Sequence, residues 1–461
     1  MEKTYNDSKN FVSLRMNTNN YQFITGGKGM KLWICMLLGF VGITPAMSQT
    51  MLTAKEDPTA VLEVREEQKD TAKLTYVITG EVRDASSGKH LQYVNVQIPG
   101  KRYATVTNAD GGFTIKTTER PRQLLFSHIG YHTQRVNITD RNSGNLQVQL
   151  VPNTVVLDEV IVRSGNPEDI VNEAINKIPV NYSRDPSLYQ CFYREVVQKR
   201  KNYIYIAEAV TDMYKSSYKN GGIGLDRVSI TKGRRLVSPR KSDTLTVKVI
   251  GGPVQAVMLD VVKNLEFLLN KEDLKLYEMR MEDPVMIADR QQYAISIRPR
   301  ATVNYALFHG TLYIDWQTLA FTRVELSLDM NDREKATRAM LVNKPLGVRF
   351  RPRELSFLIN YNYDGKLSHI SYVRSLFRFN CDWKKRLLAT NFTAVNEMVV
   401  TDRQDQDVKP IPRRDSFGER ESLADQAQFF EESDFWKGYN NIKPTESLED
   451  AVDKLKKKVL Q

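Results

Sequence analysis

Short runs of alternating apolar and polar residues dominate the chain between residues 76 and 151. Val94, Val96 and Ile98 alternate with polar neighbours, which is the period of a strand with one buried face. Turns rich in Gly, Asn and Asp separate the runs. Seven short strands in so short a stretch favour a β-sandwich, which we place at residues 76–152. The predicted strands are residues 76–83, 93–98, 103–107, 113–117, 123–128, 133–138 and 146–151.

An apolar stripe with helical spacing follows the sandwich, in a connector at residues 153–180. Ile170, Ala174 and Ile178 lie three or four residues apart, so they share one face of a helix. Asn166 precedes Pro167 and is a good N-cap residue. The connector is therefore predicted to contain a helix whose apolar stripe packs against the core.

Residues 181–410 predict a larger antiparallel β-sheet domain, with a second helix near residues 253–269. The turn at residues 362–365, Asn-Tyr-Asp-Gly, is a hairpin signal. The fold class expected for the whole chain is mainly β, with the sandwich followed by a half-barrel-like sheet and a few packed helices. Its predicted strands include residues 274–281, 292–297, 306–314, 320–328, 354–363, 367–380 and 387–400.

The last part of the chain, residues 411–461, is predicted as a helical C-terminal segment. Leu448, Val452 and Leu455 form one apolar stripe, and Ser447 opens a capping-box pattern. We expect a docked helix with a basic, solvated face.

The start of the chain carries the pattern of an export signal. Lys28 and Lys31 precede an apolar run at residues 32–43, and small residues at 46 and 48 supply a cleavage site. We therefore predict a signal peptide at residues 30–48, with an uncleaved anchor as the alternative. The run is shorter than the ~20 apolar residues that span a bilayer, and the mature chain has no other candidate span.

This interpretation assigns the flanking segments as well. Residues 1–29 are polar and precede the signal, so we interpret them as an over-called start. Residues 49–75 have little apolar periodicity and are predicted to be a linker. The expected location is the periplasm or the outer membrane of a Gram-negative envelope.

Charge and cysteine content refine the class of protein. The net charge of +11 favours anionic lipid or acidic glycan surfaces, or serves solubility alone. Nucleic acid is not an expected partner of an exported chain. Cys191 and Cys381 are the only cysteines after the predicted signal, and they either pair as a disulfide or remain two buried thiols.

Four segments of the sandwich carry a family resemblance. They are Thr-Gly-Glu-Val-Arg-Asp at 79–84, Tyr-Val-Asn-Val at 93–96, Thr-Asn-Ala-Asp-Gly-Gly-Phe at 107–113 and Ser-His-Ile-Gly-Tyr at 127–131. In order and spacing they resemble the carboxypeptidase-regulatory-like (prealbumin-like) domain. The resemblance implies a β-sandwich without catalytic groups of its own. Gly80 and Gly130 are expected where the backbone is kinked or closely approached.

A second resemblance lies in the sheet domain. Residues 310–315 and 321–325 are similar to two strands of lipoprotein-carrier-like half-barrels. That resemblance implies a curved sheet whose concave apolar face holds an acyl chain.

The sequence contains none of the common catalytic signatures. His-x-x-Glu, His-Glu-x-x-His, Gly-x-Ser-x-Gly, the phosphate-binding loop and Cys-x-x-Cys are all missing. His128 and His132 flank a predicted turn, where their spacing of four does not form a metal pair. We therefore predict no catalytic, cofactor-binding or metal-ligating residues, and no cofactor.

These patterns favour a non-catalytic exported binding protein, in which the sandwich is an adaptor and the sheet domain binds a lipid, a glycan or a protein. The alternatives are an envelope enzyme with a noncontiguous site and a purely structural component. The sequence specifies neither the ligand nor the oligomeric state.

Overall fold

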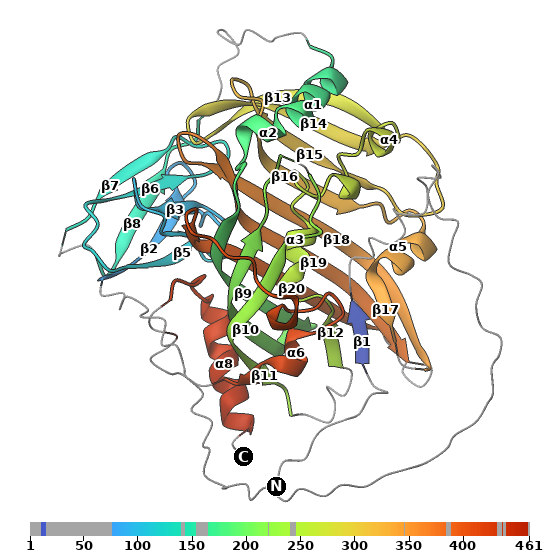
Figure 1. Ribbon diagram of the computed structural model, residues 1–461. Helices are drawn as coiled ribbons and strands as arrows, with labels where there is room; N and C mark the ends of the chain where they lie inside the picture. Colours follow the sequence, from blue (N-terminus) through green and yellow to red (C-terminus); the bar gives the residue numbers. More distant parts are fainter. Residues whose placement is uncertain are drawn as a thin grey trace, which may run out of the picture.

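The computed structural model describes residues 11–14, 76–139, 143–153, 165–219, 221–239, 246–344, 346–383, 389–430, 436 and 439–459. Within these ranges a small sandwich lies beside a long twisted sheet, and the C-terminal helix lies below the sandwich (Figure 1). The predicted signal peptide and the predicted linker lie outside the described residues.

The sandwich contains all seven predicted strands. One sheet has the order β5-β2-β8 and the other the order β4-β3-β6-β7. Val82, Phe113 and Phe126 are fully buried between them. The strands are β2 (Tyr76–Asp84), β3 (Asn95–Gln97), β4 (Ala104–Val106), β5 (Gly112–Thr117), β6 (Gln123–Ser127), β7 (Gln134–Asn137) and β8 (Leu146–Leu150).

Two glycines of the sandwich lie, as expected, where the backbone is closely approached or turns sharply. A Cβ on Gly80 would lie 2.2 Å from the carbonyl oxygen of Leu146, so only glycine lets β2 and β8 pair there. Gly130 has a φ of 75°, in the left-handed region that favours glycine.

The large sheet has eleven strands in the order β13-β14-β15-β16-β18-β19-β20-β9-β10-β11-β21. The first ten are antiparallel to their neighbours, and β21 pairs with β11 in parallel. The strands are β9 (Ser187–Lys199), β10 (Asn202–Lys215), β11 (Arg227–Val237), β13 (Tyr277–Ile287), β14 (Arg290–Pro299), β15 (Phe308–Asp315), β16 (Phe321–Leu328), β18 (Val348–Tyr363), β19 (Ser368–Trp383), β20 (Thr390–Gln404) and β21 (Gln428–Phe429).

The helices are few and short. The predicted connector helix is present, and the Asn166 side chain caps it by accepting a hydrogen bond from the Glu168 amide. The single helix expected near residues 253–269 is wrong, because the chain turns after Met258 and directs Asp260 and Lys263 into buried ion pairs. The helices are α1 (Pro167–Asn176), α2 (Ile178–Asn181), α3 (Val254–Met258), η4 (Leu265–Phe267), α4 (Lys271–Leu274), α5 (Arg333–Met340), η5 (Arg413–Asp415), α6 (Leu423–Gln426) and α8 (Glu446–Val459).

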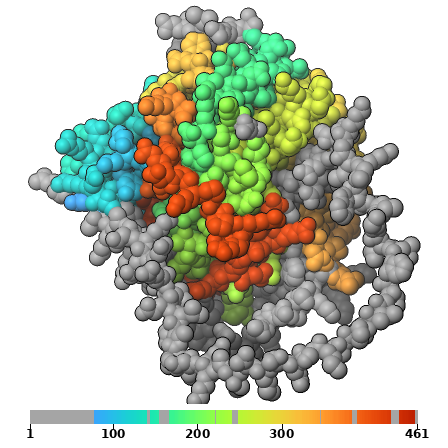
Figure 2. Space-filling model, viewed as in Figure 1, coloured from blue at the N-terminus to red at the C-terminus, as the bar shows by residue number. Residues whose placement is uncertain are grey.

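The two faces of the large sheet have different neighbours. The inner face, which carries Tyr193 of β9, packs against apolar side chains of residues 247–276 and 417–427. Figure 2 shows part of this cover, in orange to red, lying across the face in view. The inner face is thus filled by the chain itself, and the acyl chain implied by the half-barrel resemblance would have to displace these segments.

The outer face, which carries Phe192 and Arg194 of β9, holds the sandwich and the C-terminal helix. Val106 of β4 packs against Phe192, and the ring of Tyr93 stacks on Tyr372 with centroids 5.7 Å apart. Farther along the same face, α8 lies against β10 and β11.

A fourth sheet lies at the other side of the domain, in the order β12-β1-β17. β1 (Phe11–Leu14) pairs in parallel with β12 (Thr246–Val249) and antiparallel with β17 (Leu341–Asn343). Its four residues belong to the stretch interpreted as an over-called start, so this sheet uses residues upstream of the predicted export signal. That interpretation of residues 1–29 stays a prediction.

Cys191 and Cys381 are two free, buried thiols in the structure, so the disulfide pairing is not formed. The register explains why. Cys191 lies opposite Val400 of β20, whereas Cys381 lies opposite Thr390, ten residues away on the same strand. At about 3.3 Å per residue this separates them by roughly 30 Å, far beyond the ~7 Å limit between the Cα atoms of a disulfide.

No helix within the described ranges is both long enough and apolar enough to cross a membrane.

Candidate functional site

The segment before α8 joins the sandwich to the sheet domain, and we call residues 439–445 the C-terminal strap. Asn440 pairs with the backbone of Lys116 in β5 by accepting from its amide at 2.6 Å and donating to its carbonyl at 2.9 Å. The strap also contacts the sheet, because the Arg194 guanidinium donates to the Ile442 carbonyl at 2.8 Å. One segment is thereby bonded to both domains.

The hairpin at residues 107–113 anchors the other half of the strap. The Asn108 side-chain oxygen accepts from the amides of Asp110 and Gly112, which closes the turn. Its side-chain nitrogen donates to the carbonyls of Lys443 and Pro444 at 3.1 and 2.9 Å. The turn chemistry was predicted from the sequence, and its contact with the strap was not.

A cleft of about 140 Å³ opens where the sandwich, the strap and the sheet meet. Tyr93 and Asn108 contribute from the sandwich, and Ile442 and Lys443 contribute from the strap. Its floor is the outer face of β9, β10, β19 and β20, so its backbone groups are already used in sheet pairing. A ligand in this cleft therefore meets side chains.

Several polar side chains that line the cleft have unused hydrogen-bonding groups. Gln198, Tyr203, Thr393, Arg374 and Lys443 line it, and within the described ranges no side-chain hydrogen bond is formed by any of them. Polar groups at a partly enclosed site normally find partners in protein, water or ligand. The cleft thus offers donors and acceptors that the fold itself leaves unused.

The two arginines of the cleft differ in their engagement. Arg194 lies 2.7 Å from Glu208 in an ion pair with side chains 4% and 5% exposed. Arg374 lies over the Tyr93 ring at 5.3 Å and 3.9 Å from a Glu397 oxygen, too far for a hydrogen bond. Glu397 instead accepts from the Tyr372 hydroxyl at 2.6 Å. Arg194 is a structural residue, whereas the guanidinium of Arg374 has its ion pair with Glu397 and its contact with the Tyr93 ring but no hydrogen bond to the described residues.

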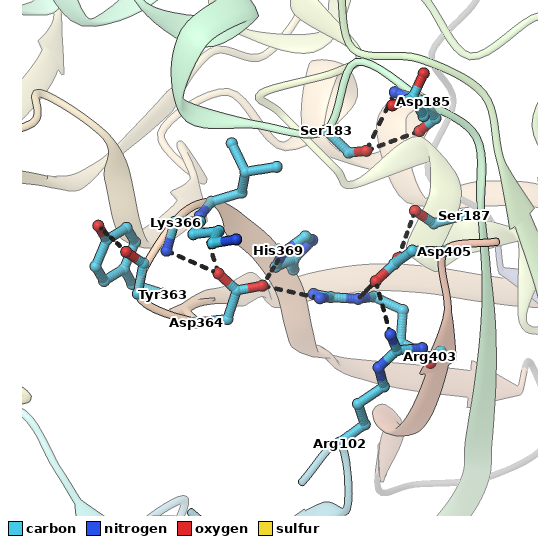
Figure 3. A network of polar contacts seen from close by, with 12 residues as sticks. Arg102, Ser183, Asp185, Ser187, Tyr363, Asp364, Lys366, His369, Arg403 and Asp405 are labelled. Atoms are coloured by element: carbon cyan, nitrogen blue, oxygen red, sulfur yellow. Dashed lines mark hydrogen bonds and ion pairs between the residues drawn. The ribbon is translucent and has the colours of Figure 1, made fainter. Parts of the chain in front are cut away.

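A second polar cluster lies at the hairpin between β18 and β19 (Figure 3). Asp364 accepts from His369 and from Arg403, each at 2.8 Å, and Arg403 also donates to Asp405. The second ring nitrogen of His369 faces the hydroxyl of Tyr189. Burial lowers the pKa of His369.

The same cluster contains a serine, a histidine and aspartates, which are the residue types of a serine hydrolase site, but they are not arranged as a catalytic triad. Ser187 donates to Asp405 and not to the histidine, so no serine nucleophile lies opposite the ring. Arg102, in the turn after β3, lies 3.6 Å from Asp405 and also donates to the Arg403 carbonyl. These contacts attach the sandwich to the end of β20.

A third cluster consists of four ionised side chains, which are Lys215, Asp226, Asp260 and Lys263. Lys215 pairs with Asp226 and Asp260, and Lys263 pairs with Asp226, with every side chain at most 1% exposed. Burial and the Lys215 charge lower the pKa of Lys263 to about 8. Two cations meet two anions without access from solvent, which is the arrangement of a structural network.

A single buried acid, Glu195, has a strongly raised pKa. Glu195 is fully buried on the inner face and accepts hydrogen bonds from the hydroxyls of Tyr193 and Tyr205. Burial raises its pKa to about 7, although both hydrogen bonds act to lower it. No further acid, base or nucleophile joins it among the contacts of the described residues.

The histidines considered from the sequence are not brought together. His128 is half-buried beside Tyr131, with its pKa lowered to about 4 by burial, and His132 is exposed. Within the described ranges no three His, Cys, Asp or Glu side chains are grouped as metal ligands are.

Sequence reasoning missed the residues that line the cleft. They come from four strands, the residue Tyr93 before β3, one hairpin, the strap and α8, so no local spacing connects them. Only the polar residues Arg374 and Glu397, inside otherwise β-like runs, were a local signal.

Comparison with known proteins identifies one part of the chain. Residues 78–162 match the CarboxypepD_reg-like domain. This confirms the resemblance found at residues 79–131, and the match continues beyond the predicted boundary at residue 152 into residues that the structure does not describe. No curated protein matches the chain.

Solved structures similar to the chain are distant. One is an outer membrane lipoprotein-sorting protein domain from Vibrio parahaemolyticus, with 12% identity and a TM-score of 0.23 over 54% of this chain and 97% of that one. Another is MucB in complex with MucA(peri), with 14% identity and a TM-score of 0.17 over 53% of this chain and 100% of that one.

A DUF1329 family protein from Desulfovibrio piger ATCC 29098 has 11% identity and a TM-score of 0.22, over 53% of this chain and 96% of that one. The resemblance to lipoprotein-sorting domains that the sequence indicated is found among these structures, and no statement on a ligand follows from it.

Proposed function

We propose that this chain is a non-catalytic, exported binding protein of the cell envelope, whose ligand site is the cleft between the sandwich, the strap and the sheet. One observation carries the proposal. Polar side chains with unused hydrogen-bonding groups converge on this cleft from the sheet and the strap, and the sandwich contributes Tyr93 and Asn108 to its lining. Sites that join domains are common places for ligands.

The ionisable clusters support a binding role over a catalytic one. The Lys215 and Asp364 clusters are composed of groups that pair with one another, and the Lys215 cluster is closed to solvent. An active site requires a titratable group within reach of a substrate. In the cleft, Glu397 is the acid, and its carboxylate is held by Tyr372 and faces Arg374.

The chemistry of the cleft favours a glycan over a lipid. Its free groups are an amide, two hydroxyls, a guanidinium and an ammonium, which suit the hydroxyls of a sugar. An acyl chain would leave these polar groups without partners.

Two measurements on protein exported to the periplasm test the proposal. N-terminal sequencing should find a chain that starts at Gln49, as the predicted signal requires. Native mass spectrometry after gentle purification should show no bound acyl lipid, and calorimetry should detect oligosaccharide binding. Acyl lipid that co-purifies at one molecule per chain would overturn the choice of the polar cleft as the site.

A further inference from the structure

We propose that the cleft binds a glycan through an anionic group on a sugar ring, and that Arg374 is the residue that recognises this group. The inference rests on the proposed function and adds the ligand class. The proposed function names the cleft as a ligand site. The inference adds that one side chain of the cleft, Arg374, recognises one chemical group of the ligand.

The charge of the cleft supports an anion. Three basic side chains, Arg194, Arg374 and Lys443, line it together with one acidic side chain, Glu397. Glu208 pairs with Arg194 from beneath, so the three basic side chains face two acidic ones at the cleft. The field at the cleft is therefore positive and favours an anionic ligand.

Arg374 is the basic residue best placed to use this field. Its side chain is 21% exposed, and its guanidinium makes no hydrogen bond to the described residues. The Nε atom is buried without a hydrogen-bond partner, 3.9 Å from a Glu397 oxygen. The guanidinium carbon lies 5.3 Å from the centre of the Tyr93 ring, and the planar fork of donors of an arginine suits an anion with two oxygens.

The floor of the cleft distinguishes a glycan from an extended acidic peptide. Peptides that bind to sheets usually add a strand to a free edge. The strands β9, β10, β19 and β20 lie inside the sheet and are paired on both sides, so they offer no such edge. The available groups are side chains such as Gln198 and Thr393, which suit ring hydroxyls.

The test compares four probes by calorimetry on the full chain: trigalacturonate, its fully methyl-esterified form, glucose 6-phosphate and an oligoglutamate peptide. Trigalacturonate should bind at least about tenfold more tightly than its ester, because a charge-assisted hydrogen bond is lost with the charge. Tight binding of glucose 6-phosphate alone would assign the anion to a phosphate instead of a carboxylate.

Arg374→Gln should remove that preference, so that the acid and the ester bind equally. The matched control is Arg378→Gln, four residues along β19, where the exposed arginine pairs with Glu354 away from the cleft. The control should leave all affinities within about twofold. Arg374→Lys keeps the charge without the fork, and it should retain part of the preference even if the Gln variant is unstable.

The outcomes separate the two proposals. Equal binding of acid and ester by the unmodified chain, unchanged in Arg374→Gln, would overturn the inference and leave glycan binding in place. Binding of an oligoglutamate peptide in preference to every sugar would overturn the glycan assignment. The absence of binding by any sugar, charged or neutral, would overturn the proposed function itself.

Discussion

The ammonium of Lys215 lies 2.7 Å from the carboxylate of Asp260, and both side chains are at most 1% exposed. Asp260 also accepts hydrogen bonds from the hydroxyls of Tyr218 and Tyr361, at 2.7 and 2.9 Å. The chain turns at Asp260, where a continuous helix near residues 253–269 was predicted. Its ion pair with Lys215 attaches the segment at residues 247–276, which covers the inner face, to the end of β10. The pair therefore contributes to the position of the cover.

Asp260→Asn should destabilise the fold by about 3–5 kcal/mol, because the substitution leaves two buried lysines with one carboxylate between them. The measurement is urea unfolding followed by far-UV circular dichroism. Glu272→Gln is the matched control, since it breaks an ion pair with Lys275 whose side chains are 71% and 66% exposed. The control should change the free energy of unfolding by less than about 0.5 kcal/mol. Equal effects of the two substitutions would show that the buried network stabilises the fold no more than an exposed ion pair does.

The buried Glu195 predicts a pH dependence of stability. Burial raises its pKa from 4.5 to about 7, so the folded state holds a proton that the unfolded state releases between these values. The contribution of Glu195 is therefore full below pH 4.5 and is lost as the pH rises to about 7. At about 1.4 kcal/mol per pH unit, the loss is of the order of 3 kcal/mol.

Glu195→Gln removes this titration while it keeps an acceptor for Tyr193 and Tyr205. The free energy of unfolding should be measured for both proteins at pH 5 and pH 8, and the difference between the two proteins isolates Glu195 from other titrating groups. We expect the unmodified chain to lose more stability than the variant between these pH values. A constant difference across the range would contradict the raised pKa.

The sandwich was predictable because its strands have one face in the core and one face outside. Val94 and Val96 are fully buried, and the side chains between them are partly exposed, so the sequence alternates visibly. Its turns depend on local chemistry, as the φ of 70° at Gly111 shows. Local periodicity and local turns were enough for this domain.

The central strands β9 and β10 were missed for the opposite reason. Residues 204–211 of β10 are buried at every position, because the cover packs on one face and the sandwich or α8 on the other. A strand buried on both faces loses its alternation. The cleft was not predictable either, since the pairing of β9, β19 and β20 brings residues almost 200 positions apart into contact.

The side-chain oxygen of Asn108 closes the hairpin, whereas its side-chain nitrogen bonds to the strap. A substitution that changes only the nitrogen therefore tests the contact with the strap. Asn108→Asp retains the oxygen that closes the hairpin, but it replaces the donor to Lys443 and Pro444 by a second acceptor. We expect a loss of about 1–3 kcal/mol and faster hydrogen exchange in the amides of the strap and the first turn of α8.

The matched control is Asn145→Asp at the edge of β8, where the side-chain oxygen accepts from Gln147 and remains an acceptor. It should leave both the stability and the exchange of the strap unchanged. If exchange in the strap is the same in both variants, the strap is held by contacts other than those of Asn108.

The strand β1 gives a prediction about export. β12 pairs with β1 and with no other strand among the described residues, although Val247 and Val249 are at most 1% exposed. Removal of residues 1–48 with the predicted signal therefore leaves the backbone amides of β12 without their strand partner. In the chain from Gln49 these amides should exchange at least about tenfold faster than in the full chain kept unprocessed in the cytoplasm.

Peptides from β2 and β5 in the sandwich serve as the internal control and should exchange equally in both chains. Unchanged protection of β12 would mean that its amides are protected without residues 11–14.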